Sequence, residues 1–388
     1  MDFFKRALEL KSETVQNRRY LHQNAEVGLN TPITKKFILK KLAEYGVYAK
    51  DCGYGICATL GSGAPCLLLR ADMDALPMRE ESGEIFSCEN GNAAHTCGHD
   101  MHAAMLLTSA KMLKENEHLL RGTVKFMFQP AEETLTGAKD MIEHGILRDP
   151  TPNAALALHT AAGKMTPGTF MYNSESVMMY CTIGIMITIH GKGGHAAYPG
   201  LAQDPIKTAF RIYNEVTDIV HKKEGVILTI GKIHSGSAPN IIPDTAIMEG
   251  SLRSQSEEEL NLLFGEIKTA AQNIAEDTGC HAQITRLFES PALVCDKKLT
   301  EFTVKIIENM NLPNFSAITN MSACASEDFA YIAKNIPSAF LYLGAGFNDE
   351  RGEFTAHHPR VIFNEDALPY GSAVLAQCAV RFFEYYRQ

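Results

Sequence analysis

The chain has 388 residues, of which 45% are hydrophobic and 21% are charged, and its formal net charge is −9. This length allows a large buried core and two domains, and the acidic balance argues against nucleic acid or an anionic membrane as a partner. No apolar run is long enough to cross a bilayer, and the N-terminal stretch lacks the apolar region of a signal peptide, so we expect a cytoplasmic protein.

The first predicted elements, in chain order, are helices up to about Tyr45, where apolar residues recur with helical spacing. Short apolar runs follow, and continuous runs of this length are typical of strands buried on both faces of a sheet. Helical patterns lie between the runs, which predicts an α/β fold in which helices cover a mixed sheet. The predicted strands are residues 55–60, 66–70, 123–128, 154–158 and 339–343, and the predicted helices between them are residues 102–115 and 137–144.

The middle of the chain has a second pattern. Residues 181–190 alternate between apolar and other side chains, as a strand with one buried face does. Asp204 followed by Pro205 predicts a helix start, and Ser256 followed by a run of glutamates predicts another. The order strand, helix, strand, strand, helix, strand indicates a ferredoxin-like α+β domain. Its other predicted strands are residues 226–233, 245–253 and 281–287, and its predicted helices end near residues 222 and 277.

These patterns predict that one domain is inserted into another. Residues 1–176 and 289–388 are expected to form the larger domain, and residues 177–288 the inserted one. One face of the inserted sheet is expected to carry no helices, which suits pairing with another subunit in a homodimer or a higher homo-oligomer.

The 10 cysteines have no regular spacing, so we expect free thiols in a reducing compartment, most of them small buried side chains. Cys97 differs because His95, His99 and His102 are close to it in the sequence. Thiolate, imidazole and carboxylate groups are the ligands that zinc and similar metals prefer. This segment therefore predicts a metal site.

Further candidate ligands follow the predicted strands, at the edge where an open α/β sheet places its site. Each has a plainer alternative, because a lone histidine is commonly structural, an acidic pair is commonly a solvated turn and a cysteine is commonly a core residue. Their convergence on one edge favours a metal centre. The residues concerned are Asp72 and Asp74 after the second predicted strand, Glu132 and Glu133 after the third, His159 after the fourth, and Cys97 with His99 at the start of a helix.

Several motifs, which together are specific, occur in order over essentially the whole chain. They are Arg70-Ala71-Asp72-Met73-Asp74-Ala75-Leu76-Pro77, Cys97-Gly98-His99-Asp100-Met101-His102, Phe128-Gln129-Pro130-Ala131-Glu132-Glu133, Gly193-Gly194-His195-Ala196, Asn240-Ile241-Ile242-Pro243 and Ala325-Ser326-Glu327-Asp328-Phe329.

In these motifs the chain resembles the N-acyl-amino-acid amidohydrolases. That family includes hippurate hydrolases and plant auxin-conjugate hydrolases, and it belongs to the aminoacylase and carboxypeptidase superfamily of dinuclear metallohydrolases. The resemblance implies a metallopeptidase-like enzyme that hydrolyses the amide bond of a small N-acyl amino acid to a carboxylic acid and a free amino acid. It also implies two divalent metal ions per subunit, zinc or manganese, with cobalt or nickel as alternatives.

The resemblance implies a ligand set that ends in the histidine of a His-x-Pro motif. Here His357, His358 and Pro359 form that motif. We expect His357 to be the ligand, with His358 as the alternative, because successive side chains of an extended chain point opposite ways. The implied metal ligands are Cys97, His99, Glu133, His159 and His357.

Other site residues are also implied by the resemblance. Residue chemistry leaves open which of Glu132 and Glu133 is a ligand, and the resemblance makes Glu132 the general base. It implies that His195 reaches the active site of the other subunit and stabilises the oxyanion, although a loop histidine is the alternative. Asn240 and Arg253 would bind the substrate carboxylate, with a surface salt bridge as the alternative for Arg253.

The sequence thus predicts a catalytic domain with an inserted lid and dimerisation domain. One rival function is that of a dipeptidase or an aminopeptidase on the same scaffold. Another is that of a non-catalytic metal-binding protein, against which the presence of Glu132 beside the complete set of candidate ligands argues.

Overall fold

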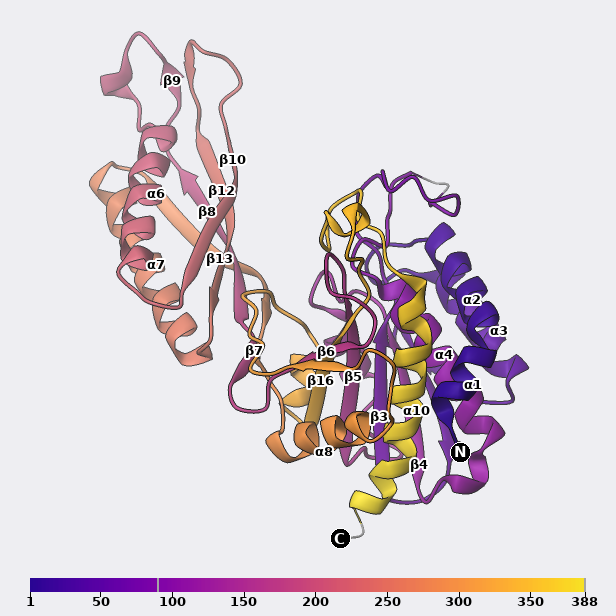
Figure 1. The fold of residues 1–388 in the computed structure, drawn as a ribbon. Helices are drawn as coiled ribbons and strands as arrows, with labels where there is room; N and C mark the ends of the chain where they lie inside the picture. The colour runs from indigo at the N-terminus through magenta and orange to yellow at the C-terminus, as the bar shows by residue number, and fades with distance from the viewer. Residues whose placement is uncertain (89–90, 387–388) are drawn as a thin grey trace. The chain divides into compact units, whose positions relative to one another are not determined.

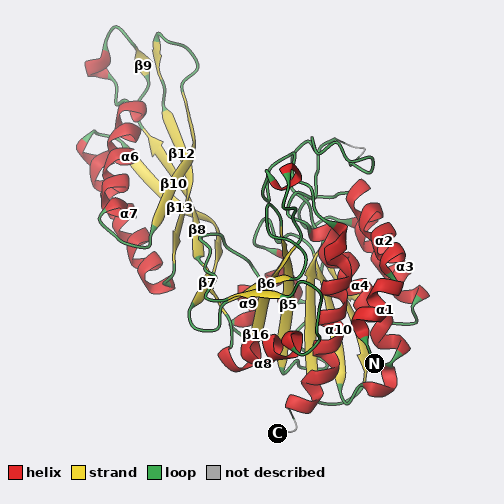
Figure 2. Cartoon of the chain, viewed as in Figure 1, coloured by secondary structure: helices red, strands yellow, loops and turns green. Residues whose placement is uncertain are grey.

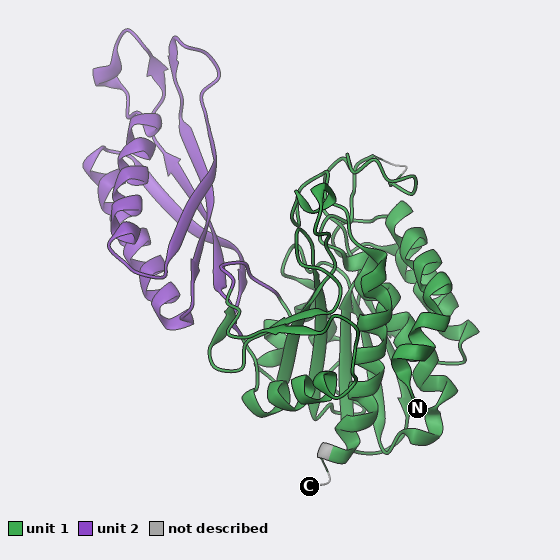
Figure 3. Ribbon diagram, viewed as in Figure 1, with its two compact units in different colours: residues 1–178, 294–322, 328–388 green, residues 179–293, 323–327 purple. Residues whose placement is uncertain are grey.

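The computed structural model describes residues 1–88 and 91–386 (Figure 1). Helices and strands alternate along much of the chain (Figure 2), and the contacts divide it into two compact units (Figure 3). The predicted mixed α/β fold class is confirmed. Unit 1 comprises residues 1–178, 294–322 and 328–388, and unit 2 comprises residues 179–293 and 323–327.

Unit 1 is built around one mixed sheet with the strand order β1-β2-β4-β3-β5-β16-β6-β15. The run β4-β3-β5-β16 is parallel, whereas β2 is antiparallel to both of its neighbours. Every residue of β3 and β4 is buried, which explains why apolar side chains occur on both faces of these strands. The strands are β1 (Tyr48–Cys52), β2 (Gly55–Gly61), β3 (Cys66–Asp72), β4 (Thr123–Gln129), β5 (Ala154–Ala161), β6 (Thr169–Tyr172), β15 (Ser316–Ile318) and β16 (Ser338–Gly344).

Helices of unit 1 pack on this sheet and on one another. Helix α4 contacts β3 and β5 as well as α2 and α10, and its residues are buried almost all round, as expected for a helix enclosed by other elements. Within the described residues, no helix has both the length and the hydropathy that crossing a membrane requires. The helices are α1 (Phe3–Glu9), α2 (Lys11–Gln23), α3 (Pro32–Glu44), α4 (His99–Glu115), α5 (Gly137–Glu143), α8 (Lys297–Glu308), α9 (Ala330–Ala333) and α10 (Leu368–Tyr385).

A left-handed turn at Gly98 separates Cys97 from His99. Gly98 is the N-cap of α4 and has a φ of 84°, a conformation that residues with a Cβ atom rarely adopt. A Cβ atom at this position would lie 2.3 Å from Oγ1 of Thr160 on β5. Glycine therefore allows the start of α4 to pack directly against β5.

Unit 2 contains a sheet with the strand order β10-β12-β8-β13 and two helices. Its main elements follow the predicted order, and the predicted caps are present. The Asp204 carboxylate accepts from the Ile206 amide at 2.8 Å, and the Ser256 hydroxyl accepts from the Glu259 amide at 3.2 Å. The elements are β8 (Cys181–His190), α6 (Pro205–His221), β10 (Ile227–Ser235), β12 (Thr245–Ser254), α7 (Glu257–Asp277) and β13 (His281–Ser290).

Short strand pairs accompany these elements, and the sequence pattern did not reveal them because apolar alternation is not detectable over so few residues. They are β9 (Gly194–His195) with β11 (Ile241–Ile242), and β7 (Val177–Met179) with β14 (Leu293–Val294).

Two predicted strands of unit 1 continue further than expected. β3 ends at Asp72, which pairs with Gln129, and not at Arg70. β5 continues to Ala161, so the prediction that the strand stops at residue 158, with His159 directly after it, is wrong. The polar residues at the ends of β3 and β5 still pair with the neighbouring strands β4 and β16. A pattern of apolar residues cannot reveal strand ends that are polar.

Candidate metal centre

The structure brings the predicted ligands of unit 1 together at the ends of β4 and β5 and at the start of α4. Sγ of Cys97 lies 3.6 Å from Nε2 of His159, and Nε2 of His99 lies 3.9 Å from Oε1 of Glu133. Ligand atoms of Cys97, His99 and Glu133 all lie within 4.8 Å of one another. His357, in the loop after β16, places its Nε2 3.4 Å from the same Glu133 oxygen. Side chains from distant parts of the sequence therefore meet at one point.

His99 and Glu133 present atoms to each other that suit a cation. Nδ1 of His99 lies 2.9 Å from the carbonyl oxygen of Asp74. A carbonyl can only accept, so Nδ1 donates its proton there and Nε2 is the ring atom directed at the centre. Within residues 1–88 and 91–386, neither His99 Nε2 nor Glu133 Oε1 has a hydrogen-bond partner, although both are buried. Buried polar atoms normally have partners, so this donor set fits a metal ion.

The charges around His99 also favour a cation. Burial disfavours a charged ring, but Asp72, Cys97 and Asp74 together outweigh burial and raise the pKa of His99 well above its usual range. Burial raises the pKa of the Cys97 thiol to about 12. The thiolate that binds metal is therefore expected to form only with a cation beside it.

The turn after β4 is fixed by Asp74. Its carboxylate oxygens accept from the Glu132 amide at 3.0 Å and from the Glu133 amide at 3.2 Å. Ala131 has a φ of 55°, which reverses the chain at this point. Oε2 of Glu132 lies 4.0 Å from Nε2 of His99. Asp74 thus holds both glutamates next to His99.

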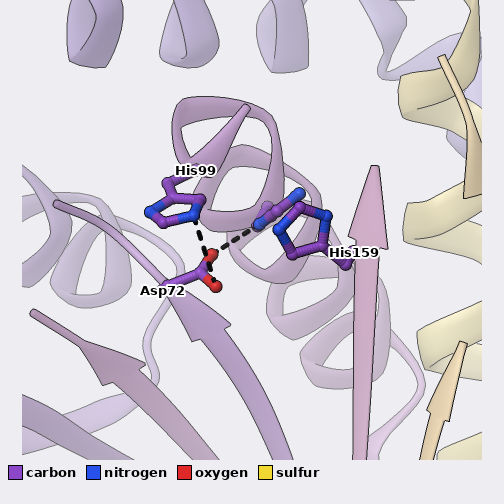
Figure 4. A group of neighbouring side chains, drawn as sticks. Asp72, His99 and His159 are labelled. Atoms are coloured by element: carbon purple, nitrogen blue, oxygen red, sulfur yellow. Dashed lines mark hydrogen bonds and ion pairs between the residues drawn. The ribbon is translucent and has the colours of Figure 1, made fainter. Parts of the chain in front are cut away.

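Asp72 and His102 belong to the same buried group, and sequence reasoning gave His102 no role. Figure 4 shows Asp72 at the end of its strand with His99 and His159 close to it. Nδ1 of His102 is hydrogen-bonded to Oδ1 of Asp72. Burial lowers the pKa of His102, although Asp72 acts in the opposite direction. The feature of the sequence that could have placed His102 in this group is its spacing from His99, because residues three apart on a helix share a face.

The two adjacent histidines of the His-x-Pro motif have different surroundings. His357 faces Glu133, and its amide donates to the carbonyl of Thr96 at 2.9 Å. His358 instead stacks on Phe354 with ring centroids 4.1 Å apart. The geometry therefore favours His357 as the ligand.

His195 and Asn240, both exposed, lie together in unit 2. His195 on β9 pairs with Ile241 on β11, and the carbonyl of Asn240 accepts from the amide of Ala196 at 3.2 Å. Residues that are distant in the sequence are thus joined by a small strand pair, which brings two of the predicted functional side chains to one place.

Arg253, on β12 of unit 2, has no carboxylate partner among the described residues. Its Nη1 donates to the carbonyl oxygen of Cys324 and to the hydroxyl of Ser326, both at 3.1 Å. The described residues thus offer Arg253 no surface salt bridge. Neutral acceptors hold one end of the guanidinium and leave its positive charge uncompensated, as a site for a carboxylate requires.

The chain is similar to known hydrolases over nearly its whole length. The model of "Peptidase family M20/M25/M40" matches residues 68–381. IAA-amino acid hydrolase ILR1-like 2 of Arabidopsis thaliana is 32% identical over 98% of this chain and 88% of its own length. N-acetyl-L-cysteine deacetylase of Bacillus subtilis is 32% identical over 97% of this chain and 89% of its own length.

Solved structures show the same fold. A putative aminohydrolase from methicillin resistant Staphylococcus aureus has a TM-score of 0.87 at 29% identity, and the match covers 99% of this chain and 100% of that chain. The YXEP protein of Bacillus subtilis, described as a dinuclear metal binding peptidase, has a TM-score of 0.80 at 27% identity, with 97% and 99% covered.

Proposed function

Because the chain belongs to peptidase family M20/M25/M40, whose members are metal-dependent hydrolases, we propose that it cleaves the amide bond of N-acyl amino acids. The products would be a carboxylic acid and a free amino acid. Relatives named for IAA-amino acids and for N-acetyl-L-cysteine support an acylated amino acid as the substrate. The observation that supports the proposal most directly is that the buried atoms His99 Nε2 and Glu133 Oε1 face each other and, among the described residues, have no hydrogen-bond partner.

The proposed ligands hold two divalent ions. Such ions, when bound, polarise an amide carbonyl and lower the pKa of a bound water. The relative described as dinuclear metal binding supports a pair of ions. Zinc suits the thiol, imidazole and carboxylate donors, with manganese, cobalt or nickel as alternatives. The proposed ligands are Cys97, His99, Glu133, His159 and His357.

Glu132 is the proposed general base. It is 6% exposed and lies beside His99, and the Asp74 carboxylate fixes the peptide that carries it. A carboxylate in this position accepts a proton from the attacking water and passes it to the leaving nitrogen. Glu133 is assigned the ligand role instead, because its Oε1 faces Nε2 of His99 and has no hydrogen-bond partner among the described residues.

Arg253 and Asn240 are the proposed contacts of the substrate carboxylate. Ser326 and the Cys324 carbonyl hold Nη1 of Arg253, so part of the guanidinium is oriented before a substrate binds. An oriented guanidinium loses little conformational freedom when it forms paired hydrogen bonds with a carboxylate.

His195 is proposed to stabilise the oxyanion in the active site of a second subunit, so the function includes a homodimer or a higher homo-oligomer. Residues 177–288 would form the lid and dimerisation domain. Strand β10 lies at the edge of its sheet and carries Ile233, which is 48% exposed, and α6 and α7 carry Phe210 and Leu262, which are 61% and 64% exposed.

A cytoplasmic location is also proposed. All cysteines but Cys324 are buried, which suits thiols in a reducing compartment.

The test is metal reconstitution followed by a substrate screen. Metal-free protein would be loaded with zinc, manganese, cobalt or nickel and assayed with N-acetyl, N-benzoyl (including hippurate) and longer N-acyl amino acids, and with dipeptides that have a free amino group. We expect two ions per chain and activity on the acylated amino acids only. Cleavage of the dipeptides alone would establish a dipeptidase or an aminopeptidase, and bound metal without any turnover would establish a metal-binding protein.

A further inference from the structure

The backbone ladder between β3 and β5 stops before the metal centre. The two strands pair as far as Arg70 opposite Ala157, whereas β3 continues to Asp72 and β5 to Ala161. At Thr160 the backbone amide donates to a side chain, the ring of His102, instead of to a strand. The two strands that carry Asp72 and His159 are thus joined here by side chains.

His102 spans this gap with both of its ring nitrogens. Its Nε2 lies 2.8 Å from the amide nitrogen of Thr160 and 2.8 Å from the Thr160 hydroxyl. A backbone amide can only donate, so Nε2 is the acceptor and the ring proton lies on Nδ1, which donates to Asp72. Because both nitrogens are engaged, His102 is not a metal ligand, although it lies within the buried group that contains His99 and His159.

The contact at Thr160 reaches the ligand His159. The Thr160 carbonyl accepts from Nδ1 of His159 at 2.8 Å, and this bond directs Nε2 of His159 towards Sγ of Cys97. The rings of His102 and His159 are also adjacent, with centroids 4.4 Å apart. Thr160 is therefore held through its amide by His102 and orients His159 through its carbonyl.

Asp72, the partner of His102 Nδ1, is also held in place. Asp72 accepts from Nη1 of Arg70 at 2.6 Å, and Asp72, Arg70 and His102 are all buried. A buried charge-assisted bond of this kind leaves the Asp72 carboxylate little freedom to move. The chain of contacts runs without a break from Arg70 through Asp72, His102 and Thr160 to His159.

We propose that His102 is a positioning residue that joins β3 to β5 where their ladder has ended and thereby holds His159 in the orientation of a metal ligand. The proposal rests on the proposed metal-dependent function. A histidine that merely filled the core would affect stability and leave metal binding unchanged, whereas a positioning histidine affects metal binding in protein that is fully folded.

Substitutions at His102 separate these roles. His102→Leu removes the hydrogen bonds of both ring nitrogens. His102→Asn is polar but too short to reach both Asp72 and Thr160. His102→Gln offers an amide donor and an acceptor on a longer side chain. Ser109→Ala is the matched control, because Ser109 is also buried on α4 and bonds only the carbonyls of Met105 and Ser372.

Each purified variant would be titrated with zinc against a chelator and loaded with cobalt for its absorption spectrum, and its metal-free thermal unfolding would be measured. We expect His102→Leu and His102→Asn to bind one of the two ions about 10–100-fold more weakly and to alter the cobalt spectrum. His102→Gln should recover most of the affinity. Ser109→Ala should unfold at a lower temperature with wild-type metal affinity.

Wild-type affinity and spectrum in His102→Leu would overturn the proposal, and so would a loss in His102→Gln as large as in His102→Leu. If His102→Leu does not fold, His102→Asn decides in the same way. A failure of the proposed function would look different, because the wild-type chain itself would then bind no metal pair.

Discussion

Substitution of the adjacent residues His357 and His358 provides a matched test of the metal centre. His357→Ala removes the imidazole whose Nε2 lies 3.4 Å from Glu133 Oε1. His358→Ala removes a ring that stacks on Phe354 instead. We expect the first substitution to weaken metal binding and the second to leave it unchanged.

The expected magnitudes follow from exposure and backbone conformation. The His357 side chain is 54% exposed, so His357→Ala should change the free energy of unfolding of the metal-free protein by no more than about 0.5 kcal/mol. Its φ of 68° is left-handed, but histidine and alanine both carry a Cβ atom, so this backbone strain cancels. His358→Ala should cost about 0.5–1.5 kcal/mol through the lost ring stack.

The effect on metal binding should be larger for His357. Loss of a group that merely supports a ligand weakens binding by about 10–100-fold, so loss of a ligand should weaken the binding of one ion by at least about 100-fold. Chelator competition with zinc measures this affinity, and denaturant unfolding of metal-free protein measures stability. A large loss of affinity in His358→Ala together with wild-type affinity in His357→Ala would refute the assignment.

Three further substitutions test other parts of unit 1. Glu132→Gln keeps the shape of the side chain but cannot accept the proton, so kcat should fall about 10²–10⁴-fold. Metal analysis should still find both ions, and an unchanged kcat would exclude Glu132 as the base. Gly98→Ala places a Cβ atom 2.3 Å from a hydroxyl of β5 at a φ of 84°, so urea unfolding should show that the free energy of unfolding falls by about 2–4 kcal/mol. The control Gly200→Ala, where a Cβ atom meets nothing within 4 Å, should change it very little. Asp100→Asn removes the carboxylate that lies 2.6 Å from Nε of Arg18, a side chain only 3% exposed. Urea unfolding should therefore show that the free energy of unfolding falls by about 3 kcal/mol, and a fall of less than about 1 kcal/mol would contradict a stabilising role of this buried ion pair.

Parts of the fold that depend on burial were predictable from the sequence. β3 and β4 are enclosed on both faces, so most of their positions are apolar and each run can be recognised. The helices of unit 2 were predictable for another reason, since the caps Asp204 and Ser256 mark their starts chemically. Such features are local and need no knowledge of tertiary contacts.

The role of His102 was not predictable because it depends on pairing between distant segments. Its partners Asp72 and Thr160 are 30 and 58 residues away in the sequence. They meet only because the ladder between β3 and β5 ends at Arg70, and no local pattern reveals where such a ladder ends. Spacing on the helix could place His102 beside His99, but it could not say whether its nitrogens bind metal or protein.

At this centre the proposed ligands differ from the supporting groups in their hydrogen-bond partners, and residue type alone does not separate the two. Asp72 accepts from Arg70 and is bonded to His102, and both carboxylate oxygens of Asp74 accept from backbone amides, so the protein already satisfies these acids. Among the described residues, Oε1 of Glu133 has no such partner. Since a buried acceptor without a partner is costly, it is kept only where something else supplies the missing contact. The same criterion that supports Glu133 as a proposed ligand therefore argues against Asp72, Asp74 and His102 as ligands.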